Sequence, residues 1–282
     1  MFIPILIILL VFIIVVLVLF VFVIAAKGRP PQGRALDYLD RGEISQGRLI
    51  TCIGDSLTHG NLGACWVEHL RDEFPQDIFL NEGINGDVVW QVHQRLKPIL
   101  KCRADLVILM IGSNDAMGSF DQSSGENYKK NNKLPEIPTF DAYKKLLPDL
   151  IDRLSEIPKI ALCTLPPIGE YPDSAINQHI GKFNVFIKKT AEDKNISILD
   201  VSDSMWNELS KRTYPVKKNY NPKMTVIAKD IYGAWIQHYI FKKPWDRVAE
   251  SRGQWLLFDQ IHLSERGARV MFNLAKEYIS TN

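Results

Sequence analysis

The chain has 282 residues, of which 46% are hydrophobic and 23% charged, and its net charge is +2. These values are typical of one globular domain with a sizeable core plus an additional segment, and no internal repeat or low-complexity tract is present. The near-neutral charge gives no indication of a nucleic-acid partner and excludes no class of small substrate. The four cysteines lack Cys-x-x-Cys spacing, which argues against a metal site or a disulfide framework and favours a reducing compartment.

The first 26 residues contain no charged side chain and consist almost entirely of Ile, Leu, Val and Phe. Such a run is long enough to cross a bilayer as a helix, so residues 1–26 are predicted to be a transmembrane anchor. A cleaved signal peptide is the alternative, because Val23-Ile24-Ala25 offers small residues, but the apolar run is much longer than a usual signal sequence. Residues 27–47, with Pro30-Pro31 and mixed charges, are predicted to be a linker containing a short helix over Arg34–Arg41.

Basic residues flank only the C-terminal side of this apolar run. Lys27, Arg29 and Arg34 follow it, and no basic side chain precedes it. The positive-inside rule therefore favours a single-pass protein whose C-terminal domain lies in the cytoplasm. A C-terminal domain on the extracytoplasmic side is the alternative, because large domains can translocate regardless of flanking charge. In that case the N-glycosylation sequon at Asn195 could carry a glycan.

Strands and helices alternate along residues 48–282, which form the third predicted region. This alternation predicts an α/β fold with a parallel sheet that is covered by helices on both faces. In such sheets ligands bind at the carboxyl ends of the strands. The predicted strands are Leu49–Ile53, Ile78–Leu80, Ala104–Ile111, Lys159–Leu165 and Ile196–Val201.

The segments between these strands carry helical apolar spacing. Helices are predicted after Gly60, over Val88–Leu100 and from Thr139 to Ile157, with a kink or break at Pro148. The polar stretch Met117–Pro138 is predicted to be a long loop bordering a site.

The region from Asp203 to Leu257 contains a predicted helix over Met224–Phe241 with aromatic residues and nearby lysines. One interpretation is a lid or a membrane-surface element, because basic charge and aromatic rings suit a lipid headgroup layer. The other is an ordinary packed helix with a solvated rim.

Ser56 is a candidate nucleophile. The buried strand before it is broken by Gly54-Asp55, and helical spacing begins after Gly60. Ser56 is therefore expected near a helix N-terminus, where backbone N–H groups favour developing negative charge. The alternative is that Ser56 only caps the helix.

Asp259 and His262 are a candidate acid and base pair. They lie three residues apart, a spacing that brings the two side chains within reach of each other in a turn. A carboxylate there would fix the imidazole tautomer and leave the other ring nitrogen to take a proton from a hydroxyl. Ser264 is predicted to cap the last helix. A histidine in this position can equally be structural.

Four sequence blocks resemble those of the SGNH hydrolases, also called GDSL esterases or lipases. Walker A, His-Glu-x-x-His and Gly-x-Ser-x-Gly patterns, which mark other enzyme classes, are absent from the sequence. The four blocks are Gly54-Asp55-Ser56-Leu57, Asn81-x-Gly83-x-x-Gly86, Gly112-x-Asn114-Asp115 and Asp259-x-x-His262.

The resemblance implies a flavodoxin-like three-layer αβα sandwich with a five-stranded parallel sheet, and ester hydrolysis without metal or cofactor. It also implies that Ser56 is the nucleophile, His262 the general base and Asp259 its orienting partner. The oxyanion hole would consist of the Ser56 and Gly86 N–H groups and the Asn114 side chain.

The expected function is that of a membrane-anchored serine esterase acting on acyl or acetyl esters. The substrate is expected to be a small-molecule, lipid or glycan ester, with the membrane as a further partner and no nucleic acid. An acyltransferase on the same fold is an alternative, as is a non-catalytic carbohydrate- or lipid-binding module.

Overall fold

The computed structural model describes residues 2–31, 33–42 and 47–282. Met1 of the predicted anchor, and residues 32 and 43–46 of the predicted linker, lie outside these ranges. Two compact units result, Met1–Pro30 and Pro31–Asn282. The first is the helix α1 (Phe2–Gly28), and the second contains every other element of the described chain.

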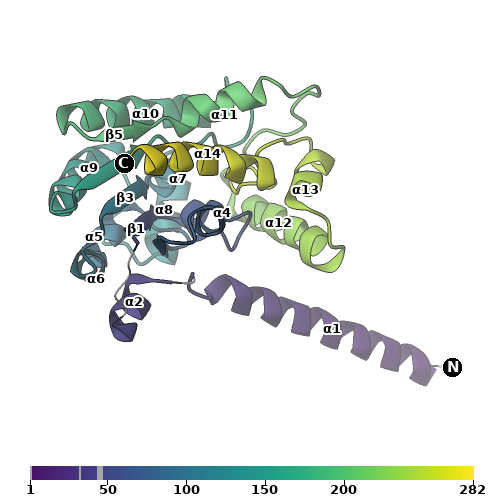
Figure 1. Ribbon diagram of the computed structural model, residues 1–282. Helices are drawn as coiled ribbons and strands as arrows, with labels where there is room; N and C mark the ends of the chain where they lie inside the picture. Colours follow the sequence, from purple (N-terminus) through teal and green to yellow (C-terminus); the bar gives the residue numbers. More distant parts are fainter. Residues whose placement is uncertain (1, 32, 43–46) are drawn as a thin grey trace. The chain divides into compact units, whose positions relative to one another are not determined.

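Five parallel strands form one sheet with the order β2-β1-β3-β4-β5, and Figure 1 labels β1, β3 and β5 of these. This is the strand order of the flavodoxin-like doubly wound fold, so the prediction of a five-stranded parallel sheet is confirmed. The loops after β2, β1 and β3 are neighbours at the carboxyl edge, because these three strands are adjacent. The strands are β1 (Leu49–Gly54), β2 (Ile78–Gly83), β3 (Leu106–Met110), β4 (Lys159–Cys163) and β5 (Ser197–Leu199).

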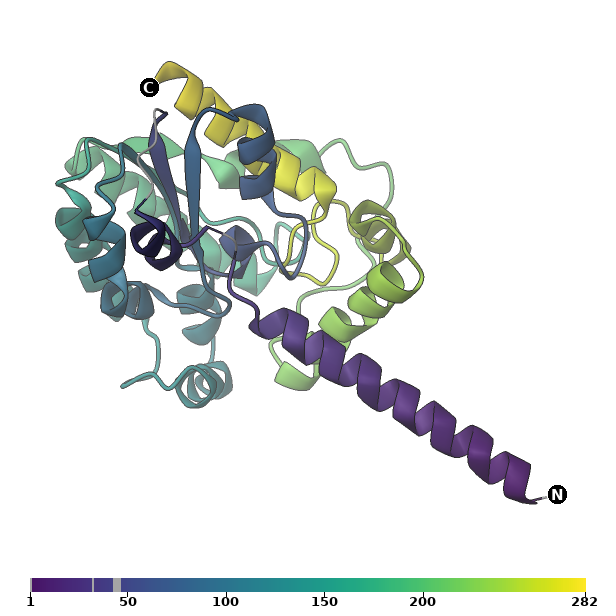
Figure 2. The same cartoon turned by 60° about the horizontal axis from the view of Figure 1, so that its bottom comes forward.

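Helices cover both faces of this sheet (Figures 1 and 2). One face packs against α5 (Val89–Gln94), α6 (Leu96–Lys101), α9 (Phe140–Leu154) and α10 (Ala175–Asp193). The other packs against α4 (Trp66–Glu73), α11 (Val201–Leu209) and α14 (Glu265–Thr281), and Figure 2 shows α14 beside α4. The remaining helices are α2 (Ala35–Arg41), α3 (Ser56–His59), α7 (Ser113–Gly118), α8 (Gln122–Asn131), α12 (Met224–Trp235), the π-helical turn η1 (Ile236–Ile240) and α13 (Trp245–Ser251).

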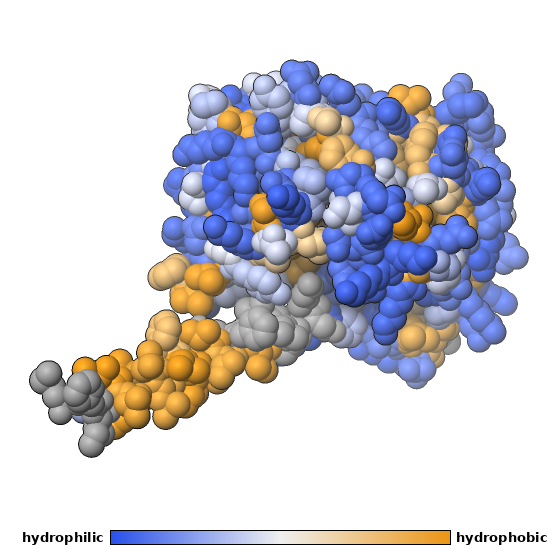
Figure 3. Space-filling model, turned by 180° about the vertical axis from the view of Figure 1, so that it is seen from behind, coloured by the Kyte–Doolittle hydropathy of each residue, from blue (hydrophilic) through white to orange (hydrophobic). Residues whose placement is uncertain are grey.

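Helix α1 is apolar, and Figure 3 shows it in orange. Among the residues that the structure describes, however, no helix is both long enough and apolar enough to cross a membrane. The structure therefore does not support the predicted span over 1–26.

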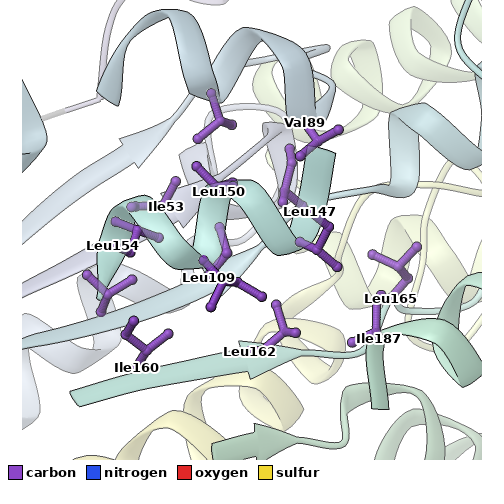
Figure 4. Close-up of a cluster of buried hydrophobic side chains, with 14 of the residues drawn as sticks. Ile53, Val89, Leu109, Leu147, Leu150, Leu154, Ile160, Leu162, Leu165 and Ile187 are labelled. Carbon is purple, nitrogen blue, oxygen red and sulfur yellow. The ribbon is translucent and has the colours of Figure 1, made fainter. Parts of the chain in front are cut away.

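Side chains along each strand point alternately to the two faces of the sheet, so the hydrophobic core consists of two clusters, one on each face. Ile53, Leu109 and Leu162 point to the α9 side, where they meet Leu147 and Leu150 (Figure 4). The residues next to them in sequence point to the α14 side, since successive side chains of a strand face opposite ways. Burial on both faces fixes the strands, and through them the positions of the loops at the carboxyl edge.

Four sequence predictions about helices need correction. The helix expected after Gly60 begins only at Trp66, and the helix expected over Val88–Leu100 is interrupted at Arg95. This break comes three residues before Pro98, whose ring clashes with the carbonyl four residues earlier in a continuous helix. The polar stretch Met117–Pro138 is not a structureless loop, because it contains α8. Helix α9 runs through Pro148 without a break.

Candidate active site

Ser56 lies where β1 ends, at the first position of the short helix α3. The Asp55 carboxylate caps this helix by accepting a hydrogen bond of 3.0 Å from the Leu57 N–H. Gly54 must be glycine, because a Cβ there would lie 2.2 Å from Thr58 Oγ1 and 2.6 Å from the Met110 carbonyl oxygen. The serine therefore sits on a tight turn, and the backbone of this turn at Gly54 packs directly against Thr58 and the Met110 carbonyl.

Asp259 and His262 lie in an irregular segment between α13 and α14, next to a bridge between Leu257 and Leu263. The Asp259 Oδ2 atom is 2.7 Å from His262 Nδ1, while its Oδ1 atom accepts the N–H groups of Ile261 and His262. Burial alone would raise the pKa of Asp259, but His262 and these backbone donors hold it below its usual range. Asp259 is thus an ionised partner for the imidazole.

His262 brings this segment to Ser56, which is distant in the sequence. The His262 Nε2 atom is 3.1 Å from Ser56 Oγ. With its Nδ1 proton donated to Asp259, a neutral ring has an unprotonated Nε2 atom facing the serine hydroxyl. Ser56 is 8% exposed and His262 5%, so both are largely shielded from water. The structure therefore brings together the nucleophile, base and carboxylate that the sequence predicts.

Asn114 lies at the start of α7, just after β3, and Gly86 lies in the turn after β2, so the two follow the strands that flank β1. The Asn114 Nδ2 group donates to Asp55 Oδ2 at 3.2 Å and to the Asp87 carbonyl at 3.0 Å, so both of its hydrogens have protein acceptors. Gly86 has a φ of +81°, a conformation that favours glycine. The sequence predicts an Asn114 amide aimed at substrate, whereas here one of its N–H groups must leave Asp55 before it can reach a substrate oxygen.

Two further carboxyl groups lie beneath the site. Burial raises the pKa of both Asp55 and Asp115 to about 7. A third, Asp87, is paired with Arg95 at 2.8 Å, and the same guanidinium contacts Glu82 at 3.0 Å. The sequence did not reveal that Arg95 pairs with these two carboxylates, because its position within a predicted helix gave no signal for it. In the described part of the chain, no group of three or more His, Cys, Asp or Glu residues could hold a metal ion.

Glu170 anchors the segment that carries Asp259 and His262. Its Oε1 atom accepts the N–H groups of Trp255, Leu256 and Leu257 at 2.8, 2.6 and 2.8 Å. The Gly169 N–H also donates to the Gln260 carbonyl at 2.6 Å. Sequence reasoning missed Glu170, although its place just beyond β4 put it at the edge where ligands bind.

A small depression adjoins the nucleophile. It is too narrow to hold a water molecule, and small residues contribute much of its wall. Gly63 cannot carry a side chain here, because a Cβ would lie 2.6 Å from the Leu263 carbonyl oxygen. The lining residues are Ser56, Leu57, Gly60, Gly63, Ala64, His262 and Leu263.

The sequence pattern of the GDSL-like lipase/acylhydrolase family matches residues 52–270. No curated protein matches the chain. Among solved structures, Axe2, an acetylxylan esterase from Geobacillus stearothermophilus, is similar with a TM-score of 0.57 at 18% identity, covering 83% of this chain and 94% of its own. LAE5, an alpha/beta hydrolase enzyme from the metagenome of Lake Arreo, Spain, gives a TM-score of 0.55 at 19% identity, covering 83% and 95%. At these identities the structural likeness shows the fold.

Proposed function

Because the chain belongs to the GDSL-like lipase/acylhydrolase family and is a carboxylic ester hydrolase, we propose that it cleaves acyl esters through Ser56, His262 and Asp259. The observation that carries this proposal is the continuous chain of contacts from Asp259 to His262 at 2.7 Å and from His262 to Ser56 at 3.1 Å. Such an arrangement activates a serine hydroxyl, which is a weak nucleophile by itself.

In the first half of the reaction, Ser56 Oγ attacks the ester carbonyl and passes its proton to His262 Nε2. The tetrahedral intermediate then collapses to an acyl-serine, and His262 returns the proton to the departing alcohol oxygen. In the second half, water attacks the acyl-serine, gives a proton to His262 and releases the carboxylic acid as Ser56 regains its proton. Asp259 holds the imidazole and stabilises its charged form in both halves.

The negative charge of the tetrahedral intermediate needs hydrogen-bond donors. We assign this role to the backbone N–H groups of Ser56 and Gly86 and to the Asn114 side chain. Their loops follow β1, β2 and β3, three adjacent strands. Each such donor contributes roughly 10²–10³-fold in rate. The Asn114 amide serves when the oxygen of the intermediate replaces Asp55 as the acceptor of one of its N–H groups.

The proposed substrates are esters of short acyl groups, acetyl above all. The depression beside Ser56 has no room for a water molecule as it stands, so a short acyl group requires the least widening to enter, and glycine and alanine residues form part of its wall. An acetylxylan esterase is among the proteins with a similar fold, which is consistent with an acetylated glycan as the natural ester. Longer acyl chains would have to lie outside this depression.

A series of p-nitrophenyl esters of increasing acyl length tests both parts of the proposal. We expect the acetate to be the best substrate and Ser56→Ala to abolish turnover and labelling by a fluorophosphonate. Ser202→Ala is the matched control, since Ser202 is also 8% exposed but lies in α11. Labelling of Ser56→Ala at the wild-type rate would show that Ser56 is not the nucleophile. Preference for long chains would refute only the acetyl assignment.

Transfer of the acyl group to an alcohol instead of water is the alternative reaction of the same site. Assays with added alcohol or sugar acceptors separate the two by product. Ester products that outnumber free acid at modest acceptor concentration would identify a transferase.

We also propose that α1 attaches the hydrolase to a membrane, with the catalytic unit on the cytoplasmic side. The large apolar side chains between Ile5 and Val18 have exposed fractions from 46% at Ile13 to 69% at Leu6 and Ile8. Exposed apolar surface of this kind is unfavourable in water and suits a lipid environment. The basic residues after α1 favour the cytoplasmic side.

A further inference from the structure

We propose that the segment Gln122–Asn132 is a brace for the oxyanion hole, in which Tyr128 positions the Asn114 amide and Asn132 positions the Gly86 peptide. The proposal rests on the ester hydrolysis assigned above, and it adds two positioning residues that belong to none of the four family blocks. Neither residue is assigned contact with substrate.

Tyr128 holds the end of Asn114 that faces away from its acceptors. The Tyr128 hydroxyl donates to Asn114 Oδ1 at 2.7 Å. The ring is half-buried, but the hydroxyl end is enclosed, and burial raises the pKa of Tyr128 well above its usual value. The hydroxyl therefore stays a neutral donor. All described contacts of the amide then agree with one orientation, in which Oδ1 accepts and Nδ2 donates.

This hydrogen bond matters most during the reaction. When an Nδ2 hydrogen leaves Asp55 for the substrate oxygen, Tyr128 and the Asp87 carbonyl still hold the amide in place. A hydrogen bond accepted at Oδ1 also polarises the amide and strengthens its N–H groups as donors. Both effects favour the transition state more than bound substrate, so they should act on kcat.

Asn132 makes the equivalent contact with Gly86. Its Nδ2 group donates to the Gly86 carbonyl at 2.8 Å. The held carbonyl belongs to the Gly86–Asp87 peptide, next to the peptide that carries the Gly86 N–H, and because Gly86 has a positive φ and glycine has the most alternative backbone conformations, this hydrogen bond restricts the rotation between the two peptides. Asn132 is in turn tied to Tyr128, because the Asn132 N–H donates to the Tyr128 carbonyl at 3.0 Å.

The brace itself is firmly seated against the helix that carries Asn114. Asp121 caps α8 by accepting the Ser124 N–H at 2.7 Å. A Cβ at Gly125 would lie 3.0 Å from the Gly118 carbonyl oxygen and 2.3 Å from Ile137, so α8 approaches α7 as closely as glycine permits. Tyr128 and Asn114 therefore sit on two helices whose spacing is fixed.

The test compares Tyr128→Phe with Tyr278→Phe in the full chain, using p-nitrophenyl acetate. Both substitutions remove one hydroxyl, but Tyr278 lies in α14 beside Ser197, at the amino end of β5 and away from the site. We expect Tyr128→Phe to lower kcat roughly tenfold with KM changed less than about twofold, a smaller loss than the roughly 10²–10³-fold expected for Asn114→Ala. Tyr278→Phe should leave both constants unchanged.

The decisive measurement repeats Tyr128→Phe in an Asn114→Ala background. If Tyr128 acts through Asn114, its loss should have no further effect on kcat there, whereas an unrelated effect on folding would lower kcat by the same factor in both backgrounds. Equal factors, or a Tyr128→Phe variant as active as Tyr278→Phe, would overturn the role of Tyr128.

Asn132→Ala provides a second test of the brace, and its result does not depend on whether Tyr128→Phe folds. It should also lower kcat with little change in KM, and it should add to Asn114→Ala, because it acts on Gly86. Unchanged kcat would overturn the role of Asn132. A wild-type protein that cleaves no ester would refute the proposed function and the brace together, while an active wild type with silent brace variants would refute only the brace.

Discussion

The Glu170 carboxylate accepts the Leu256 N–H at 2.6 Å, which ties the connection after the fourth strand to the segment that carries His262. Arg212 pairs with the same carboxylate at 2.6 Å, and the Glu170 side chain is completely buried. Burial raises the pKa of Glu170, while the three backbone donors and Arg212 act in the opposite direction. His262 thus depends on a buried ion pair that takes no part in the chemistry.

Glu170→Gln should destabilise the fold and lower activity. The neutral amide leaves Arg212 without its carboxylate and places an NH₂ group where an oxygen accepts the Trp255 N–H. Breaking a buried pair in this way costs roughly 3–5 kcal/mol, which urea unfolding would measure. Glu208→Gln is the control, because its partner Lys211 is exposed and such pairs contribute about 0–1 kcal/mol. Equal losses in the two variants would contradict this role for Glu170.

Asp259→Asn should lower kcat by roughly 10³–10⁴-fold. The amide can donate to His262 Nδ1, which favours the tautomer with a proton on Nε2, and that nitrogen then cannot accept the serine proton. Steady-state kinetics with p-nitrophenyl acetate measures the loss, and circular dichroism checks that the variant is folded. Activity within about tenfold of wild type would rule out Asp259 as the orienting group.

The contribution of Asp115 to the stability of the fold should decrease as the pH rises from about 4 to about 7. Burial raises the pKa of Asp115 to about 7 from an ordinary value of 3.8, so in this range the unfolded chain loses its proton before the folded one does. Folding therefore binds a proton, and this contribution is complete below pH 4 and lost above pH 7. Asp55 adds an effect of the same sign.

Asp115→Asn isolates this effect, since asparagine resembles the protonated acid at every pH. The Tm of the variant relative to wild type should rise between pH 5 and pH 8. Asp173→Asn, at an exposed position, is the control, and its Tm difference should stay constant. A constant difference for Asp115→Asn as well would show that Asp115 is ionised throughout.

Protease protection in sealed vesicles tests the proposed orientation. A cytoplasmic catalytic unit should be digested from that side, and removal of residues 1–30 should leave an active enzyme, because Pro31–Asn282 is a compact unit. Asn195 is exposed and can report the opposite result in a eukaryotic cell. A glycan on Asn195, or resistance to protease until the lumenal side is opened, would place the unit across the membrane.

The residues within each block were predictable, whereas the contacts between distant segments were not. Ser56 and His262 stand out in short motifs, the parallel sheet follows from the alternation of elements, and its flavodoxin-like arrangement was implied by the family resemblance. Glu170 and Leu256 are 86 residues apart in the sequence, and no local pattern joins them. The polar composition of Met117–Pro138 suggested a loop, but capping by Asp121 and packing against α7 stabilise a helix there.

The division of the site between the sheet edge and a tethered segment has a consequence for amide hydrogen exchange. Ser56, Gly86 and Asn114 follow three paired strands, so their surroundings should exchange only when the sheet unfolds as a whole. The segment from Gln254 to Leu263 lies outside the sheet, and Glu170, the Gly169 contact, a bridge and the buried side chains of Leu256, Leu257 and Phe258 hold it in place. Its amides should exchange faster than those of β1, and each opening would separate base from nucleophile while the oxyanion donors stay assembled.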